Sequence, residues 1–118
     1  MDRTRFIKEY NKASDQLDKR RMKKLINKSV ELGTLGDQKG HSNLIITMEE
    51  LSELGQQTSK LLRGRCDKIR LVEEMADVMI CFGYLKEIGG ISTNDLYKAM
   101  NVKLDRLDKV MNEKGVYK

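Results

Sequence analysis

The residue composition predicts a chain built from helices. None of the 118 residues is proline and none is tryptophan, whereas Leu, Met, Lys, Glu and Arg dominate. These straight-chain residues lose little rotamer freedom in a helix, and the β-branched and aromatic runs that favour strands are few. We therefore expect an all-α fold.

Apolar residues recur every three or four positions, which is the period of a helix with one face in a core. The expected helical segments cover residues 4–32, 42–64, 67–88 and 92–114. The first segment is one long helix or two shorter ones, with Ser14 or Asp15 as the candidate cap of a second. Gly89-Gly90 ends the third segment, and the capping-box pattern Ser92-Thr93-Asn94-Asp95 starts the fourth. A polar loop from Gly33 is expected between the first two segments.

Four helices with short connections predict a four-helix bundle-like domain in which each helix buries one face. The apolar arc of the second segment consists of Leu44, Met48, Leu51, Leu54, Gly55, Thr58, Leu61 and Leu62. The inward residues of the third are Leu71, Val72, Met75, Val78, Met79, Phe82 and Leu85. Those of the fourth are Leu96, Met100, Leu104, Leu107 and Met111.

The chain length fits a single domain, residues 1–118, in which residues 1–33 form an N-terminal helical segment. No apolar stretch approaches the roughly 18 residues that cross a bilayer, and the N-terminus lacks an apolar signal core. We therefore expect a cytoplasmic protein. Cys66 and Cys81 are expected on one helix about 22 Å apart, too far for a disulfide, so both thiols should be reduced.

The formal net charge is +5 and the isoelectric point is about 9.2. Such a charge attracts nucleic acid or a polyphosphate ligand, and it does not by itself distinguish them. The basic run 19–24 has no interleaved aromatic residues and no recognisable docking helix, which favours a solvated helix face. Nucleic acid is therefore not the expected partner.

Two acidic pairs stand at helical spacing. Glu50 and Glu53 are three residues apart, as are Glu74 and Asp77, so each pair lies on one face of its helix with about 5–6 Å between Cβ atoms. Twenty residues separate the pairs, the length that a helix, a tight turn and a returning helix need to bring them level. Four carboxylates around one cavity would repel each other unless a hard divalent cation lies among them. The spacing predicts a magnesium site.

The pattern Glu49-Glu50-x-x-Glu53, then 20 residues, then Glu74-x-x-Asp77, resembles the signature of the MazG-like all-α nucleoside triphosphate pyrophosphohydrolases. The later run Asn101-x-Lys103-x-x-Arg106 is similar to a basic motif of that family. The resemblance covers residues 42–115. It implies Mg²⁺-dependent cleavage of an NTP or dNTP between the α and β phosphates, giving a nucleoside monophosphate and pyrophosphate, with Mn²⁺ as a substitute ion.

The resemblance also assigns roles to individual residues. The positions that match metal ligands are Glu50, Glu53, Glu74 and Asp77. Glu49 is a candidate carboxylate that either supports the metal ligands from outside the coordination sphere or activates water, and with Glu50 it makes up the expected catalytic pair. The candidate substrate contacts are Lys60, Asn101, Lys103 and Arg106. Arg and Lys suit phosphate because the guanidinium fork matches its oxygens and the ammonium acts as a point charge.

Several alternatives stay open. Some members of the family stack aromatic residues on the base, and the lack of tryptophan leaves the base preference undecided. A related pyrophosphatase specific for dUTP or phosphoribosyl-ATP would use the same metal chemistry. A non-enzymatic basic helical module that binds nucleic acid or protein is the alternative from another class. Apolar positions such as Ile46 and Ile80 are expected to stay uncovered in one chain, which predicts a homodimer or homotetramer.

Overall fold

The computed structural model describes residues 3–13, 19–36 and 41–115. This part of the chain contains five helices and no strand, which confirms the all-α prediction for these residues. The helices are α1 (Arg3–Lys12), α2 (Lys19–Gly36), α3 (His41–Leu62), α4 (Lys68–Gly89) and α5 (Thr93–Glu113). Within the same ranges, no helix has an apolar window long enough to cross a membrane.

The N-terminal segment forms two helices, because α1 ends at Lys12 and α2 begins at Lys19. The candidate caps Ser14 and Asp15 lie outside the described residues. The prediction that a polar loop starts at Gly33 is wrong, since α2 continues to Gly36. Glycine lowers helix stability by roughly 1 kcal/mol compared with alanine, and that penalty does not forbid a helix.

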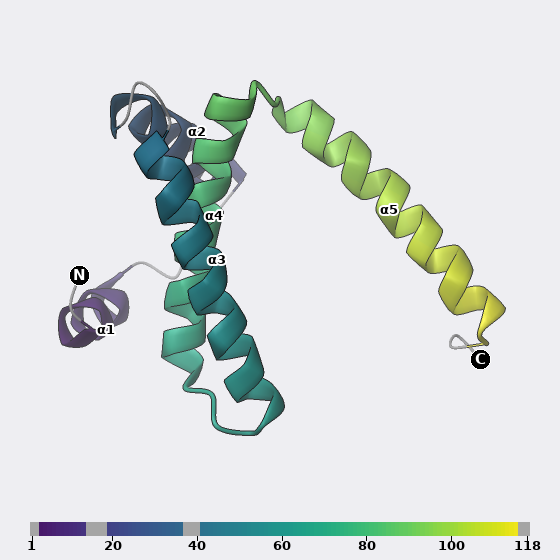
Figure 1. Ribbon diagram of the computed structural model, residues 1–118, viewed down its shortest axis with the longest axis horizontal. Helices are drawn as coiled ribbons and strands as arrows, with labels where there is room; N and C mark the ends of the chain where they lie inside the picture. Colours follow the sequence, from purple (N-terminus) through teal and green to yellow (C-terminus); the bar gives the residue numbers. More distant parts are fainter. Residues whose placement is uncertain (1–2, 14–18, 37–40, 116–118) are drawn as a thin grey trace.

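Helix α4 is the centre of the fold, because α2 and α3 both pack against it (Figure 1). The helices α3 and α4 run antiparallel and are joined by a tight turn. In this turn Gly64 adopts the left-handed φ of 72°, and the Arg65 amide donates to the Lys60 carbonyl at 2.8 Å. The Asp67 side chain then accepts from the Ile69 amide at 3.0 Å and caps α4. It also forms an ion pair with Arg3 of α1.

The turn corrects one expectation about the cysteines. Cys66 precedes the cap of α4, so it lies in the turn, and only Cys81 is helical. Both cysteines are free. The helix begins one residue after Asp67 because the aspartate side chain satisfies an amide that has no partner inside the helix.

Helix α5 leads away from the rest of the chain (Figure 1). Its predicted capping box is confirmed: the Asp95 amide donates to Ser92 Oγ, and the Ser92 amide donates to an Asp95 carboxylate oxygen, both at 3.0 Å. Gly90, with a φ of 64°, ends α4 and turns the chain. The predicted packing of four helices into one bundle is therefore not seen within a single chain.

The expected inward faces are largely uncovered. Among the side chains that the structure describes, Val78 and Cys81 are the only apolar ones that are buried. The residues that were expected inside and are exposed are Leu44, Met48, Leu51, Leu61, Leu62, Met75, Met79, Phe82, Leu96, Met100, Leu104 and Leu107. Instead, α3 turns Asn43, Thr47 and Gln57 toward the interior. Periodicity identifies an apolar face without identifying its neighbour, and none of the five described helices covers these faces.

Candidate metal centre

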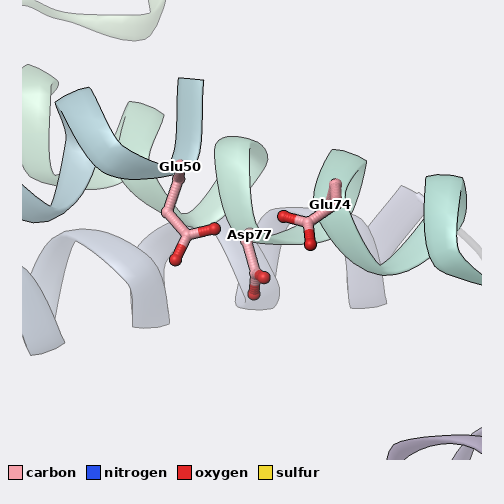
Figure 2. Close-up of side chains that lie close together, drawn as sticks. All are labelled: Glu50, Glu74 and Asp77. Carbon is pink, nitrogen blue, oxygen red and sulfur yellow. The ribbon is translucent and has the colours of Figure 1, made fainter. Parts of the chain in front are cut away.

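Three carboxylates from two helices converge at the α3–α4 contact. Glu50 of α3 and Glu74 and Asp77 of α4 each offer an oxygen, and these oxygens lie within 4.8 Å of one another. Figure 2 shows the three side chains close together, with Glu50 coming from the facing helix. The three-residue spacing of Glu74 and Asp77 places both on one face of α4, and the antiparallel packing brings Glu50 opposite them. The structure thus brings together three of the four residues that the sequence assigns as metal ligands, and their role as ligands stays a prediction.

Burial makes this arrangement unusual for acidic side chains. Glu74 is only 3% exposed. One oxygen of Glu74 and one of Glu50 are buried with no hydrogen-bond partner among the described residues. A buried carboxylate without a partner is costly, and protonation or a cation relieves that cost. The donor set consists of carboxylate oxygens, the ligands that Mg²⁺ and Ca²⁺ prefer, so these residues fit a hard divalent cation.

The carboxylates also raise one another's pKa. Burial, followed by the charges of Asp77, Glu53 and Glu74, raises the pKa of Glu50 from 4.5 to about 7. Burial and then the neighbouring Glu53 carboxyl raise the pKa of Glu74, while Arg70 acts in the opposite direction. Burial raises the pKa of Asp77, although its hydrogen bond with Glu50 lowers it in part. A cation would therefore displace protons from the cluster near neutral pH.

The remaining acidic residues of the motif lie at the edge of this trio. Glu53 is exposed and is not among the three residues whose oxygens converge. Its charge nevertheless contributes, after burial, to the raised pKa of Glu50 and of Glu74. Glu49 is exposed next to Glu50 on α3.

Two neighbouring residues were missed by the sequence argument. The Arg70 Nε lies 3.4 Å from a Glu74 carboxylate oxygen, an ion pair without hydrogen-bond geometry. One oxygen of Glu73 is also buried without a hydrogen-bond partner. The four-residue spacing of Arg70 and Glu74 on one helix was the available signal. Arg70 is therefore the cationic partner of the buried Glu74 carboxylate.

Thr47 and Cys81 lie beside the trio in the α3–α4 contact. Thr47 is 3% exposed, and its hydroxyl donates to the Asn43 carbonyl at 2.8 Å. Burial raises the pKa of the Cys81 thiol, and the charges of Glu50 and Asp77 raise it further, while Thr47 lowers it. A thiol kept protonated in this way is a poor nucleophile. The cluster therefore offers carboxylates for chemistry, with no activated thiol beside them.

The predicted substrate contacts are not gathered at the trio within one chain. Lys60 is exposed in the last turn of α3, ten residues beyond Glu50 and so about 15 Å further along the helix. The residues Asn101, Lys103 and Arg106 are all exposed on α5, which leads away from α3 and α4 (Figure 1). Their roles stay predictions. Comparison with models of known families, with curated proteins and with solved structures found no match.

Proposed function

We propose that this chain is a Mg²⁺-dependent nucleoside triphosphate pyrophosphohydrolase of the MazG-like class. It cleaves an NTP or dNTP between the α and β phosphates and releases a nucleoside monophosphate and pyrophosphate. The observation that carries the proposal is the convergence of Glu50, Glu74 and Asp77, two of which have a buried, unpartnered oxygen. The spacing of the acidic motif supports the same activity.

In the proposed site Glu50, Glu74 and Asp77 hold the cation, and Glu53 completes its ligand set from the exposed side. Bound Mg²⁺ supplies charge neutralisation for the phosphate chain and a water of lowered pKa. Hydrolysis of the α–β anhydride bond would use a water molecule, so the reaction would need no side-chain nucleophile. Glu49 would accept the proton of the attacking water, and Arg70 holds Glu74 in place through their ion pair.

The proposed substrate residues of α5 act on another copy of the chain. Asn101, Lys103 and Arg106 are exposed on a helix that leads away from its own carboxylates, so a triphosphate at the trio meets them only from a neighbouring chain. The proposed enzyme is accordingly a homodimer or homotetramer. Lys60 contacts the distal end of the substrate, because it lies toward the far end of α3.

Burial favours this proposal over a non-enzymatic helical module. An acidic motif that serves as a solvated salt-bridge face has exposed carboxylates, whereas Glu74 is 3% exposed and Glu50 is half-buried. A pyrophosphatase specific for dUTP or phosphoribosyl-ATP would use the same trio. The choice among these substrates is part of the test.

The test incubates the purified protein with a panel of NTPs, dNTPs and phosphoribosyl-ATP, with and without Mg²⁺, and resolves the products by chromatography. Monophosphate and pyrophosphate are expected from the wild type, with loss of turnover in Glu50→Gln and Asp77→Asn. Glu87→Gln, an exposed acidic position on α4, is the matched control. Diphosphate and orthophosphate as products would overturn α–β cleavage. If no nucleotide is turned over and Mg²⁺ also fails to stabilise the protein, the proposal as a whole is overturned.

A further inference from the structure

Helix α5 carries an apolar stripe that, beyond its first turn, no other described element of the chain covers. We define this α5 stripe as Leu96, Met100, Leu104 and Leu107, whose spacing of four, four and three places them on one helical face. The exposed fractions of these side chains are 38%, 54%, 56% and 49%. An amphipathic helix that extends into water with such a face is stabilised when a second apolar surface covers it.

The same chain offers a second uncovered apolar surface. A cavity of about 520 Å³ lies between α2, α4 and the first turn of α5. We call it the α2–α4 groove. Its apolar lining includes Leu25 and Ile26 of α2, Met79 and Phe82 of α4, and Leu96 at the start of α5. Met79 and Phe82 are 56% and 49% exposed, so the groove is open to an incoming side chain.

We propose that α5 of one copy occupies the α2–α4 groove of a second copy, and that the second copy returns the same contact. The chain's own α5 contributes only its first turn to the groove and then leads away, so the rest of its stripe cannot reach the groove in this conformation (Figure 1). A twofold exchange covers both surfaces on both chains with two identical contacts and leaves no open end. Pairing of α5 with α5 alone would leave both grooves uncovered.

Charge supports the groove as the partner of α5. Asp108 and Asp105 lie about 40° and 100° around the helix from Leu104, along one edge of the α5 stripe. Lys28 and Lys86 line the groove and are its basic residues. Opposite charges at the rim of an apolar contact help to set its orientation. The exchange does not depend on the proposed catalytic function.

The test measures molar mass by sedimentation equilibrium for the wild type and two variants, Leu104→Asp in the stripe and Met79→Asp in the groove. Both side chains are 56% exposed in one chain, so the new carboxylate stays solvated in the monomer and is buried only on association. We expect a dimeric or higher wild type and a dissociation constant about 100-fold higher, or more, in each variant. Val102→Asp is the matched control, since Val102 is also exposed on α5 but lies on the opposite face.

Mixing the two variants identifies the contact itself. A heterodimer of Leu104→Asp with Met79→Asp retains one native helix in one native groove, whereas each variant alone retains none. We therefore expect the mixture to associate more tightly than either variant by itself. Should Leu104→Asp lose helicity in circular dichroism, Leu107→Asp replaces it.

Three results would overturn the exchange. A wild type that stays monomeric at about 100 µM excludes a second copy in the groove. This holds even if the amides of α5 are protected from hydrogen exchange. Loss of association in Leu104→Asp but not in Met79→Asp indicates pairing of α5 with α5. Equal loss in Val102→Asp indicates that added charge, and not the stripe, is responsible.

Discussion

The affinity of this protein for Mg²⁺ is predicted to rise steeply with pH between 6 and 8. The pKa of Glu50 is raised to about 7 by burial and by the neighbouring carboxylates, and Mg²⁺ binds the deprotonated form. With that pKa, about 9% of Glu50 is ionised at pH 6 and about 91% at pH 8, so the apparent affinity rises about tenfold. With the ordinary pKa of 4.5 it would change by only a few per cent.

The direction of the accompanying stability change follows from the same shift. Between pH 4.5 and about 7 the folded, metal-free protein binds more protons at Glu50 than the unfolded chain, so its free energy of unfolding falls as the pH rises through this window. The raised pKa of Glu74 acts in the same direction. Mg²⁺ reverses the trend, because a cation stabilises the ionised cluster. The stabilisation by Mg²⁺ is therefore expected to grow with pH.

Calorimetric titration with Mg²⁺ or Mn²⁺ at pH 6, 7 and 8, in two buffers of different ionisation enthalpy, measures both the affinity and the protons released. We expect at least about 0.9 proton released per ion at pH 6 from Glu50 alone, falling as the pH rises. Glu50→Gln removes this contribution, whereas Glu87→Gln on the exposed face of α4 retains it. An affinity that is flat from pH 6 to 8, or binding without proton release at pH 6, would refute the reasoning.

Four further substitutions test other parts of the structure by thermal or urea unfolding. Arg70→Gln is expected to lower the free energy of unfolding by about 1–2 kcal/mol at pH 8, because it leaves the buried Glu74 carboxylate without its cationic partner. The loss stays modest because Arg70 is partly exposed, and saturating Mg²⁺ should reduce it. Ser92→Ala removes the cap of α5 and should cost about 1 kcal/mol, seen as faster amide exchange in its first turn. Gly64→Ala should destabilise by about 1–2 kcal/mol because its φ is 72°, and a wild-type stability in this variant would contradict the turn geometry. Gly55→Ala, inside α3 with no atom near the added methyl group, should stabilise by about 0.5–1 kcal/mol.

The helices and the pairing of Glu74 with Asp77 could be predicted because both depend on short-range spacing, whereas the convergence was predicted for four carboxylates and includes three. The three-residue spacing of Glu74 and Asp77 fixes them on one face whatever else the chain does, and the capping box at Ser92 marks a helix start. The extension of α2 through Gly33 could not be predicted, because glycine weakens a helix without ending it. Local sequence patterns thus predicted which segments are helical better than they predicted the residues at which each helix begins and ends.

The covered faces could not be predicted for a different reason. On α3, Met48 is 71% exposed and Leu62 is 89% exposed, while Thr47 and Gln57 are each 3% exposed. Hydropathy ranks these residues in the opposite order. Which face of a helix is buried depends on the neighbouring helix, and the α3–α4 contact is built around carboxylates and polar side chains. Arg70 was missed for the same reason, since its importance comes from the burial of Glu74.

The buried oxygens of Glu50 and Glu74 make the α3–α4 contact a site of local frustration, where the folded state retains a repulsion that Arg70 relieves only in part. Apolar side chains of similar volume at these positions would give a chain that is more resistant to unfolding and unable to hold a cation. Selection for thermal stability alone would therefore be expected to remove the trio first. The presence of the three carboxylates is therefore better explained by a function of the protein than by a contribution to its stability.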